Sequence, residues 1–185
     1  MKKSILSVWV AALSLAATGV QAADSINVQS NDIPRNGKID ARFEFDGFGC
    51  QGQNQSPQLS WQNLPAGTQS IAISAYDPDA PTGSGFWHWM VVNLPGNMQS
   101  LSANAGSKDG KQLPNGAIQL RNDYGYAGFG GVCPPKGDLP HRYIFTIYAL
   151  KQPLNLNADT PPALAGFMLN SNAIAKGTLS GYYVR

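Results

Sequence analysis

Residues 71-IAISAYDPDAPTGSGFWHWMVVNL-94 decide the fold class of this chain. The run 71-IAISAY-76 alternates, and 89-WMVVNL-94 is almost entirely apolar, β-branched or aromatic, as a strand buried on both faces would be. The residues between them, 77-DPDAPTGSG-85, combine Asp, Pro and Gly, which favour turns. We therefore expect two core strands joined by a proline-stiffened loop.

The rest of the chain continues this β pattern. Residues 42-RFEF-45 alternate, 143-YIFTIYAL-150 is a second mostly apolar run, and 20 glycines and 13 prolines mark many turns between such runs. One helix is expected at 161-PPALAGFMLNSNAIAKG-177, with Thr160 as its cap, Pro161 and Pro162 in its first turn and Gly177 at its end. A last strand, 178-TLSGYYVR-185, follows it. The predicted architecture is mainly β, with one or two peripheral helices.

The first 22 residues have the pattern of a secretory signal peptide. Lys2 and Lys3 form a basic head, 5–20 is an uncharged apolar run, and Val20-Gln21-Ala22 resembles a cleavage site. We expect residues 23–185 to form a single domain in the periplasm or outside the cell. Without Lys2 and Lys3 the formal charge falls from +2 to zero. That balance argues against nucleic-acid and polybasic membrane-surface partners, and no later stretch predicts an integral membrane protein.

Cys50 and Cys133 are the two cysteines of the chain. An oxidising compartment favours a disulfide between them, and the lack of CxxC spacing makes a metal site a weak alternative. No metal and no cofactor are predicted.

The two histidines, His88 and His141, each stand where a proline-rich loop meets a strong strand. Asp77 and Asp79 lie close to the first and Tyr143 to the second, which favours a shared pocket. The alternative is structural: His88 on one face of its strand with Trp87 and Trp89 on the other, and a solvated His141. Neither a G-x-S-x-G elbow nor an H-E-x-x-H pair is present. Asp77 and Asp79 suit paired acid/base chemistry only if they face the same space.

Five stretches together resemble one known family. The stretches 54-NQSPQLSW-61, 77-DPDAP-81, 87-WHW-89, 121-RNDYGYAGFGG-131 and 134-PPKGDLPHRY-143 closely resemble signatures of the phosphatidylethanolamine-binding proteins. That family includes the Raf kinase inhibitor proteins, and the chain looks most like its bacterial periplasmic branch. The resemblance implies a large antiparallel sheet with a smaller one. It also implies a small pocket for phosphate or a phospholipid headgroup, lined here by Asp77, Asp79, Pro81, His88, Pro134, Pro135, His141 and Tyr143.

The resemblance implies a binding protein rather than an enzyme. In this interpretation Tyr143, His141 and backbone N–H groups around residues 130–133 donate to the anion, and Asp77 orients them. A protein partner, regulated by binding, and a homodimer are further expectations. The alternative is a phosphoester hydrolase with Asp77 or His141 as general base, and a third option is that the protein acts through its outer surface.

Two details follow from the resemblance. Some relatives carry two adjacent histidines where this chain has His88-Trp89, and strand alternation would let only one of these positions face the pocket. A Cys50–Cys133 disulfide would brace the rim of the pocket, because Cys133 precedes the pocket prolines.

Overall fold

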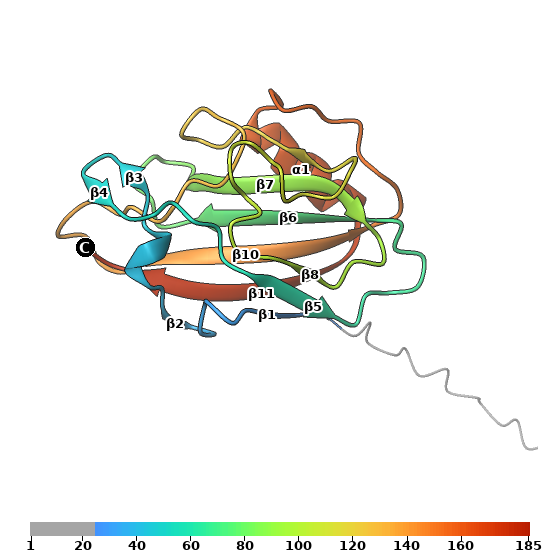
Figure 1. Ribbon diagram of the computed structural model, residues 1–185, viewed down its shortest axis with the longest axis horizontal. Coiled ribbons are helices and arrows are strands. Elements are labelled where there is room, and N and C mark those ends of the chain that lie inside the picture. The colour runs from blue at the N-terminus through green and yellow to red at the C-terminus, as the bar shows by residue number, and fades with distance from the viewer. Residues whose placement is uncertain (1–24) are drawn as a thin grey trace, which may run out of the picture.

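A six-stranded sheet forms the centre of the molecule. The computed structural model describes residues 25–185, and the expected signal peptide at residues 1–22 lies outside the described residues. The strands follow in the order β2 (Gly37–Lys38), β11 (Ala173–Tyr183), β10 (His141–Leu150), β6 (Ser70–Asp77), β7 (Phe86–Pro95) and β9 (Ile118–Gln119) (Figure 1). Every neighbouring pair is antiparallel except β2 with β11. The sheet is therefore mixed, because the short strand β2 joins the edge of β11 in parallel.

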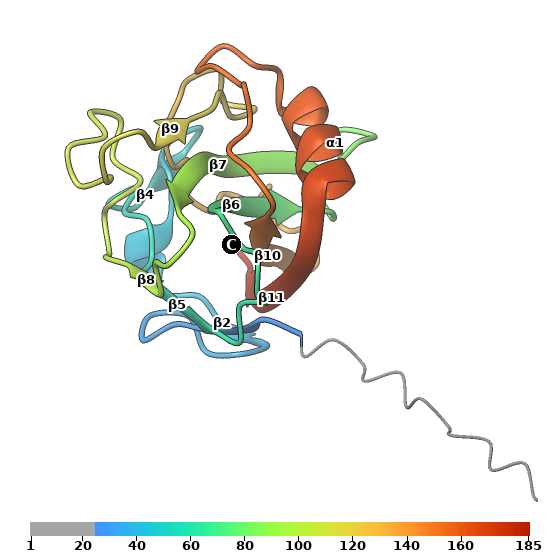
Figure 2. The same cartoon turned by 90° about the vertical axis from the view of Figure 1, so that its right-hand side faces the viewer.

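Two smaller sheets and two helical segments complete the fold. One small sheet has the order β1 (Asn27–Gln29), β5 (Leu59–Gln62), β8 (Ser100–Leu101), and the other is the hairpin β3 (Asp46–Gly47), β4 (Cys50–Gln51). The 3-10 helix η1 spans Ala41–Phe43 and the helix α1 spans Pro162–Asn172. Figure 2 shows α1 on one side of the large sheet and β5 with β8 on the other.

The central strands are buried on both faces, as the sequence predicts. In β6, Ile71 and Ile73 pack into the core between the large sheet and the β1–β5–β8 sheet. Ala72 faces the opposite way, toward a second apolar cluster that includes Ala165 and Leu169 of α1. The alternation of a strand thus fills two cores from one segment.

The expected strand at residues 42–45 is wrong. Asp40 Oδ1 accepts a hydrogen bond from the Arg42 backbone N–H at 2.9 Å and begins η1 instead. A local side-chain cap of this kind offers the backbone an alternative to strand pairing. Phe43, which is buried, is held in the core by this turn.

The helix near the C-terminus is confirmed, but its expected end is wrong. It stops at Asn172, and Gly177 lies inside β11, paired with Ile147 of β10. A Cβ at Gly177 would collide with the backbone of Ile26, so this glycine allows β1 and β11 to approach closely. Thr160 does not cap the helix either, since its Oγ1 accepts from the Asn157 N–H at 3.1 Å.

The Cys50–Cys133 disulfide is present and links the β3–β4 hairpin to the loop before β10. Over residues 25–185, none of the helices has the length and apolar character needed to cross a membrane.

Candidate functional site

A β-bulge in β7 sets the direction of the His88 side chain. Where β6 pairs with β7, Ala75 lies opposite Trp89 and Tyr76 lies opposite Trp87, so His88 is an extra residue without a partner on β6. A bulge re-aims side chains and is frequent beside functional sites. Trp89 accordingly packs between the sheets, while Trp87 packs against the helix cluster.

The bulge corrects the expectation that Trp87 and Trp89 share a face, while only one of His88 and Trp89 faces the cavity, as expected. The two tryptophans do not share a face, and simple alternation does not choose between His88 and Trp89. The His88 ring lies edge-on to Tyr143 with centroids 5.1 Å apart, and Trp89 is fully buried behind it. Only His88 of this pair lines the cavity described below.

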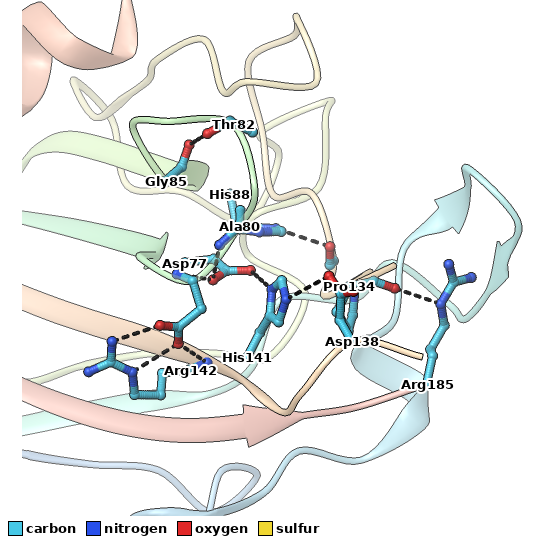
Figure 3. A network of polar contacts seen from close by, with 12 residues as sticks. Asp77, Ala80, Thr82, Gly85, His88, Pro134, Asp138, His141, Arg142 and Arg185 are labelled. Atoms are coloured by element: carbon cyan, nitrogen blue, oxygen red, sulfur yellow. Dashed lines mark hydrogen bonds and ion pairs between the residues drawn. The ribbon is translucent and has the colours of Figure 1, made fainter. Parts of the chain in front are cut away.

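The two oxygens of the Asp77 carboxylate accept hydrogen bonds from different partners, one from a turn and the other from a histidine. Its Oδ1 accepts from the backbone N–H groups of Asp79 at 2.8 Å and Ala80 at 3.1 Å. Its Oδ2 accepts from His141 Nδ1 at 2.8 Å, and both side chains are almost completely buried. Asp138 Oδ2 lies 3.5 Å from Nε2 of the same ring. Figure 3 shows the His141 ring between the two carboxylates. Asp77 therefore fixes the ring, and Nε2 is the nitrogen on the side of Asp138, in a residue that lines the cavity described below.

Asp79 points away from this pair. Its carboxylate accepts three hydrogen bonds from Arg142: one from the backbone N–H at 2.9 Å, one from Nε at 2.9 Å and one from Nη2 at 2.7 Å. These bonds lower the pKa of Asp79 to about 2. His141 and Arg142 are consecutive in β10 and project to opposite sides. The two carboxylates of the turn thus do not face one space, which removes the basis for a paired acid/base site.

A cavity of about 370 Å³ opens at this end of the large sheet. Six of the eight expected residues line it: Asp77, Pro81, His88, Pro134, Pro135 and His141. The strands β6, β7 and β10 and the loops that follow or precede them therefore converge as expected. Asp79 and Tyr143 are not among the lining residues.

Tyr143 lies beneath the cavity rather than in its wall. The residue is 1% exposed, and its hydroxyl has no hydrogen-bond partner within residues 25–185. Burial and the nearby Asp77 carboxylate raise the pKa of the phenol above its usual value. The hydroxyl is therefore a neutral, buried donor that the protein leaves unused.

Sequence reasoning missed the aromatic part of the wall. The additional lining residues are Phe48, Ala80, Thr82, Phe86, Asp123, Tyr124 and Cys133. The rings of Phe86 and Tyr124 meet edge to face with centroids 4.7 Å apart. Phe86 is two residues from His88, and Tyr124 lies in one of the quoted stretches, so both were within reach of the sequence.

The predicted anion nest around residues 130–133 is wrong for Gly130, Gly131 and Val132, because their N–H groups donate to other parts of the protein. Gly130 N–H donates to His88 O at 2.8 Å, and Gly131 N–H donates to the Asn54 side chain at 2.7 Å. Val132 N–H donates to Phe43 O at 3.1 Å. The protein itself uses these donors to hold the loop against β7 and η1, because buried N–H groups need partners.

The rim is tied together on one side of the cavity. The Cys50–Cys133 disulfide joins the β3–β4 hairpin to the pocket prolines. Arg185 donates from Nε to Pro134 O at 2.8 Å and from Nη1 to Gly49 O at 2.7 Å. Phe48, at the hairpin tip, is 79% exposed and forms the outer lip.

A larger and more open hollow, of about 610 Å³, lies at the edge formed by β1 and β11. It contains Arg35 and Lys176, but Arg35 donates to the carbonyls of Val28 and Thr178 and so fastens the chain. Lys176 Nζ donates to Asn170 Oδ1 at 2.9 Å. The buried histidines are all at the other end of the sheet.

Comparison with known proteins identifies the family. The family described as phosphatidylethanolamine-binding protein matches residues 29–184. The chain is 48% identical to UPF0098 protein YbcL of Escherichia coli over 99% of this chain and 98% of that protein. It is 41% identical to UPF0098 protein YbhB of the same organism over 83% and 97%.

A solved structure and a further relative agree with this match. The crystal structure of E. coli YbcL superposes with a TM-score of 0.85 at 49% identity, covering 87% of this chain and 99% of that one. A protein of Mycobacterium tuberculosis named as a lipoprotein, LppC, is 34% identical over 82% of this chain and 66% of its own length. That relative and the disulfide indicate an extracytoplasmic protein. The chain belongs to the phosphatidylethanolamine-binding protein family.

Proposed function

We propose that this chain is a periplasmic binding protein whose cavity at the end of β6, β7 and β10 takes a small phosphate-like anion. The observation that carries the proposal is the pair of buried histidines at the cavity wall, each with one nitrogen fixed by the protein. Nδ1 of His141 is held by Asp77, and Nδ1 of His88 lies 2.8 Å from Gly130 O. Both rings are therefore oriented before any ligand arrives, which reduces the entropy cost of binding.

The surrounding wall gives such a site an apolar character. Prolines and the rings of Phe48, Phe86 and Tyr124 form most of it. A ligand that carries an apolar or flat group next to its anion would bury that group against these rings. Rigid prolines at the lip keep the cavity open without a ligand.

A hydrolase is the second candidate, because the Asp77–His141 contact has the geometry of a general base held by a carboxylate. The hydroxyl groups and the sulfur at the cavity are poor candidates for the nucleophile of this reaction, because each already has a partner. Thr82 donates to Gly85 O, Tyr124 donates to Gly131 O at 3.1 Å, and the Cys133 sulfur is in the disulfide. Such a reaction would have to use water as its nucleophile.

One titration separates the two candidates. Phosphoethanolamine is added to signal-free protein and followed by phosphorus NMR, with H141Q as the test variant and R142Q as the matched control. Arg142 is the next residue of β10 and binds Asp79 outside the cavity. We expect the ligand signal to broaden or shift with wild type and R142Q but not with H141Q, and no free phosphate to appear.

Two other results contradict the binding proposal. Phosphate that accumulates overnight with wild type but not with H141Q would identify a hydrolase. No change in the ligand signal with the wild type would refute an anion site at this cavity.

We also propose that cavity occupancy regulates association with a protein partner, a second copy of the chain included. Phe48 of the cavity wall is 79% exposed, and Leu139, two residues before His141, is 84% exposed, so a partner that covers them would meet the ligand at this end of the sheet. Sedimentation velocity with and without phosphoethanolamine tests the homodimer. An identical monomer distribution in both would remove the second copy as the partner.

A further inference from the structure

The hydrogen bonds of His88 fix its tautomer. Nδ1 lies 2.8 Å from Gly130 O and 3.1 Å from Gly131 O. A carbonyl oxygen only accepts hydrogen bonds, so Nδ1 carries the ring proton. Nε2 has no hydrogen-bond partner in the part of the chain that the structure describes, and the ring lines the cavity. Neutral His88 therefore presents a lone pair, which is an acceptor, to whatever the cavity holds.

The surroundings of His88 favour this neutral form. The side chain is buried, and burial lowers the pKa of His88 below its usual value. The two carbonyls and the carboxylates of Asp77 and Asp123 act in the opposite direction, but burial is the largest effect. An acceptor facing an oxyanion would be repulsive, so an anion can sit beside Nε2 only if a proton lies between them.

The charges around the cavity also oppose a fully ionised phosphate. None of the lining residues is Lys or Arg, whereas Asp77 and Asp123 both belong to the wall. The neighbouring titratable groups on the packed elements are Asp77 of β6, Asp123 and Tyr124 of the 120–131 loop, Lys136 and Asp138 of the loop before β10, His141 and Tyr143 of β10, and Arg185. Lys136 is exposed, and Arg185 donates to two carbonyls at the rim. A dianion would thus add negative charge where little compensates it.

We propose, on the basis of the binding function above, that the cavity takes a phosphate monoester together with one proton, shared between the ligand and Nε2 of His88. A singly protonated monoester donates its O–H to Nε2 of His88, and its remaining oxygens stay in solvent. The second pKa of a phosphate monoester is about 6, so this proton is available near neutral pH. Phosphodiesters and sulfate esters carry no such proton, and they bind only if the buried His88 ring is itself protonated. His88 therefore selects monoesters over diesters and sulfates.

The test compares three ligands that share the ethanolamine group: phosphoethanolamine, glycerophosphoethanolamine and ethanolamine O-sulfate. Each is titrated into the signal-free protein by calorimetry at pH 6.5, 7.5 and 8.5, in buffers of different ionisation enthalpy. We expect the association constant of the monoester to fall about tenfold between pH 7.5 and 8.5, because binding takes up one proton. The buffer dependence should give an uptake of about one proton at pH 8.5. The diester and the sulfate should bind at least about tenfold more weakly than the monoester at pH 7.5.

A variant adds an independent readout. H88Q places an amide that can donate without a proton from solution, so the pH dependence of monoester binding should flatten and the diester should no longer be disfavoured. R142Q, outside the cavity, should keep the wild-type slope. Circular dichroism establishes that both variants are folded.

The outcomes separate this inference from the proposed function. Monoester affinity that is unchanged from pH 6.5 to 8.5, or a diester that binds as tightly as the monoester, overturns the role of His88 while anion binding stands. Failure of all three ligands to bind at any pH overturns the anion site, and this inference with it.

Discussion

Replacing Asp77 by Asn removes the charge that connects the turn to His141 and leaves the shape almost unchanged. Asp77 is 2% exposed, and its two oxygens accept from two backbone N–H groups and from His141 Nδ1. An asparagine can keep its oxygen on the turn, but its NH₂ group then faces Nδ1. The histidine must accept there, so its proton moves to Nε2.

The expected loss of stability follows from the bond that is changed. A hydrogen bond to a charged group contributes about 1.5–3 kcal/mol, and here both partners are buried. We expect D77N to lower the free energy of unfolding by about 2 kcal/mol at pH 7. The matched control is D79N on the same turn. Its carboxylate is 30% exposed and its partner Arg142 is 62% exposed, so the loss should stay below about 1 kcal/mol.

Two measurements decide the result. Urea unfolding of wild type, D77N and D79N gives the free energies, and nitrogen-15 NMR of the imidazoles gives the tautomer of His141. A D77N protein no less stable than D79N, or a His141 that keeps its proton on Nδ1 in D77N, would refute the assignment of Asp77 as the group that fixes this ring.

Three other predictions concern the rim, the buried phenol and pH. The C50S/C133S double variant should lose about 2–5 kcal/mol of unfolding free energy in urea and bind phosphoethanolamine more weakly; equal stability and affinity would show that the disulfide braces nothing. Y143F should be as stable as wild type or up to about 1 kcal/mol more stable, because it removes a buried hydroxyl without a partner. A tenfold (about 1.4 kcal/mol) loss of ligand affinity in Y143F would instead place that hydroxyl on the ligand. The folded-state pKa of His88 lies below its unfolded value of about 6.5. Below that pH the unfolded chain binds the extra proton, so the free energy of unfolding decreases as the pH is lowered, by up to about 1.4 kcal/mol per pH unit. A slope that H88Q does not reduce would contradict this origin.

Part of the candidate site could be predicted from the sequence. Asp77, His88 and His141 could be chosen because rare residue types stood at loop–strand junctions and within stretches that resemble the family. Their roles could not be chosen this way. Asp77 and Asp79 are two residues apart, yet one fixes His141 in the interior and the other binds Arg142 at the surface. Which way each carboxylate turns depends on the register of β6 against β10, which no local pattern records.

The same limit explains the other differences. The expected end of α1 at Gly177 followed the rule for helix stops, but pairing of residues 173–183 with β10 and the close approach of Ile26 override it. The orientation of His88 depends on a bulge, which becomes visible only when β6 and β7 are aligned. Phe48 reaches the cavity through the β3–β4 hairpin, which the disulfide holds against the loop before β10.

The sequence by itself determined the β class, the buried strands 71–76, 89–94 and 143–150, the cysteine pair and the end of the sheet where the histidines gather. These features depend on hydrophobic pattern and turn chemistry. Both act over a few residues, so short stretches of sequence are enough to predict them. Only the tertiary structure decided the tautomer of His88, the opposite directions of Asp77 and Asp79, the unpartnered hydroxyl of Tyr143 and the aromatic wall. Each of these depends on atoms brought together from distant segments, because hydrogen bonds and burial are properties of the folded arrangement and not of the order of residues.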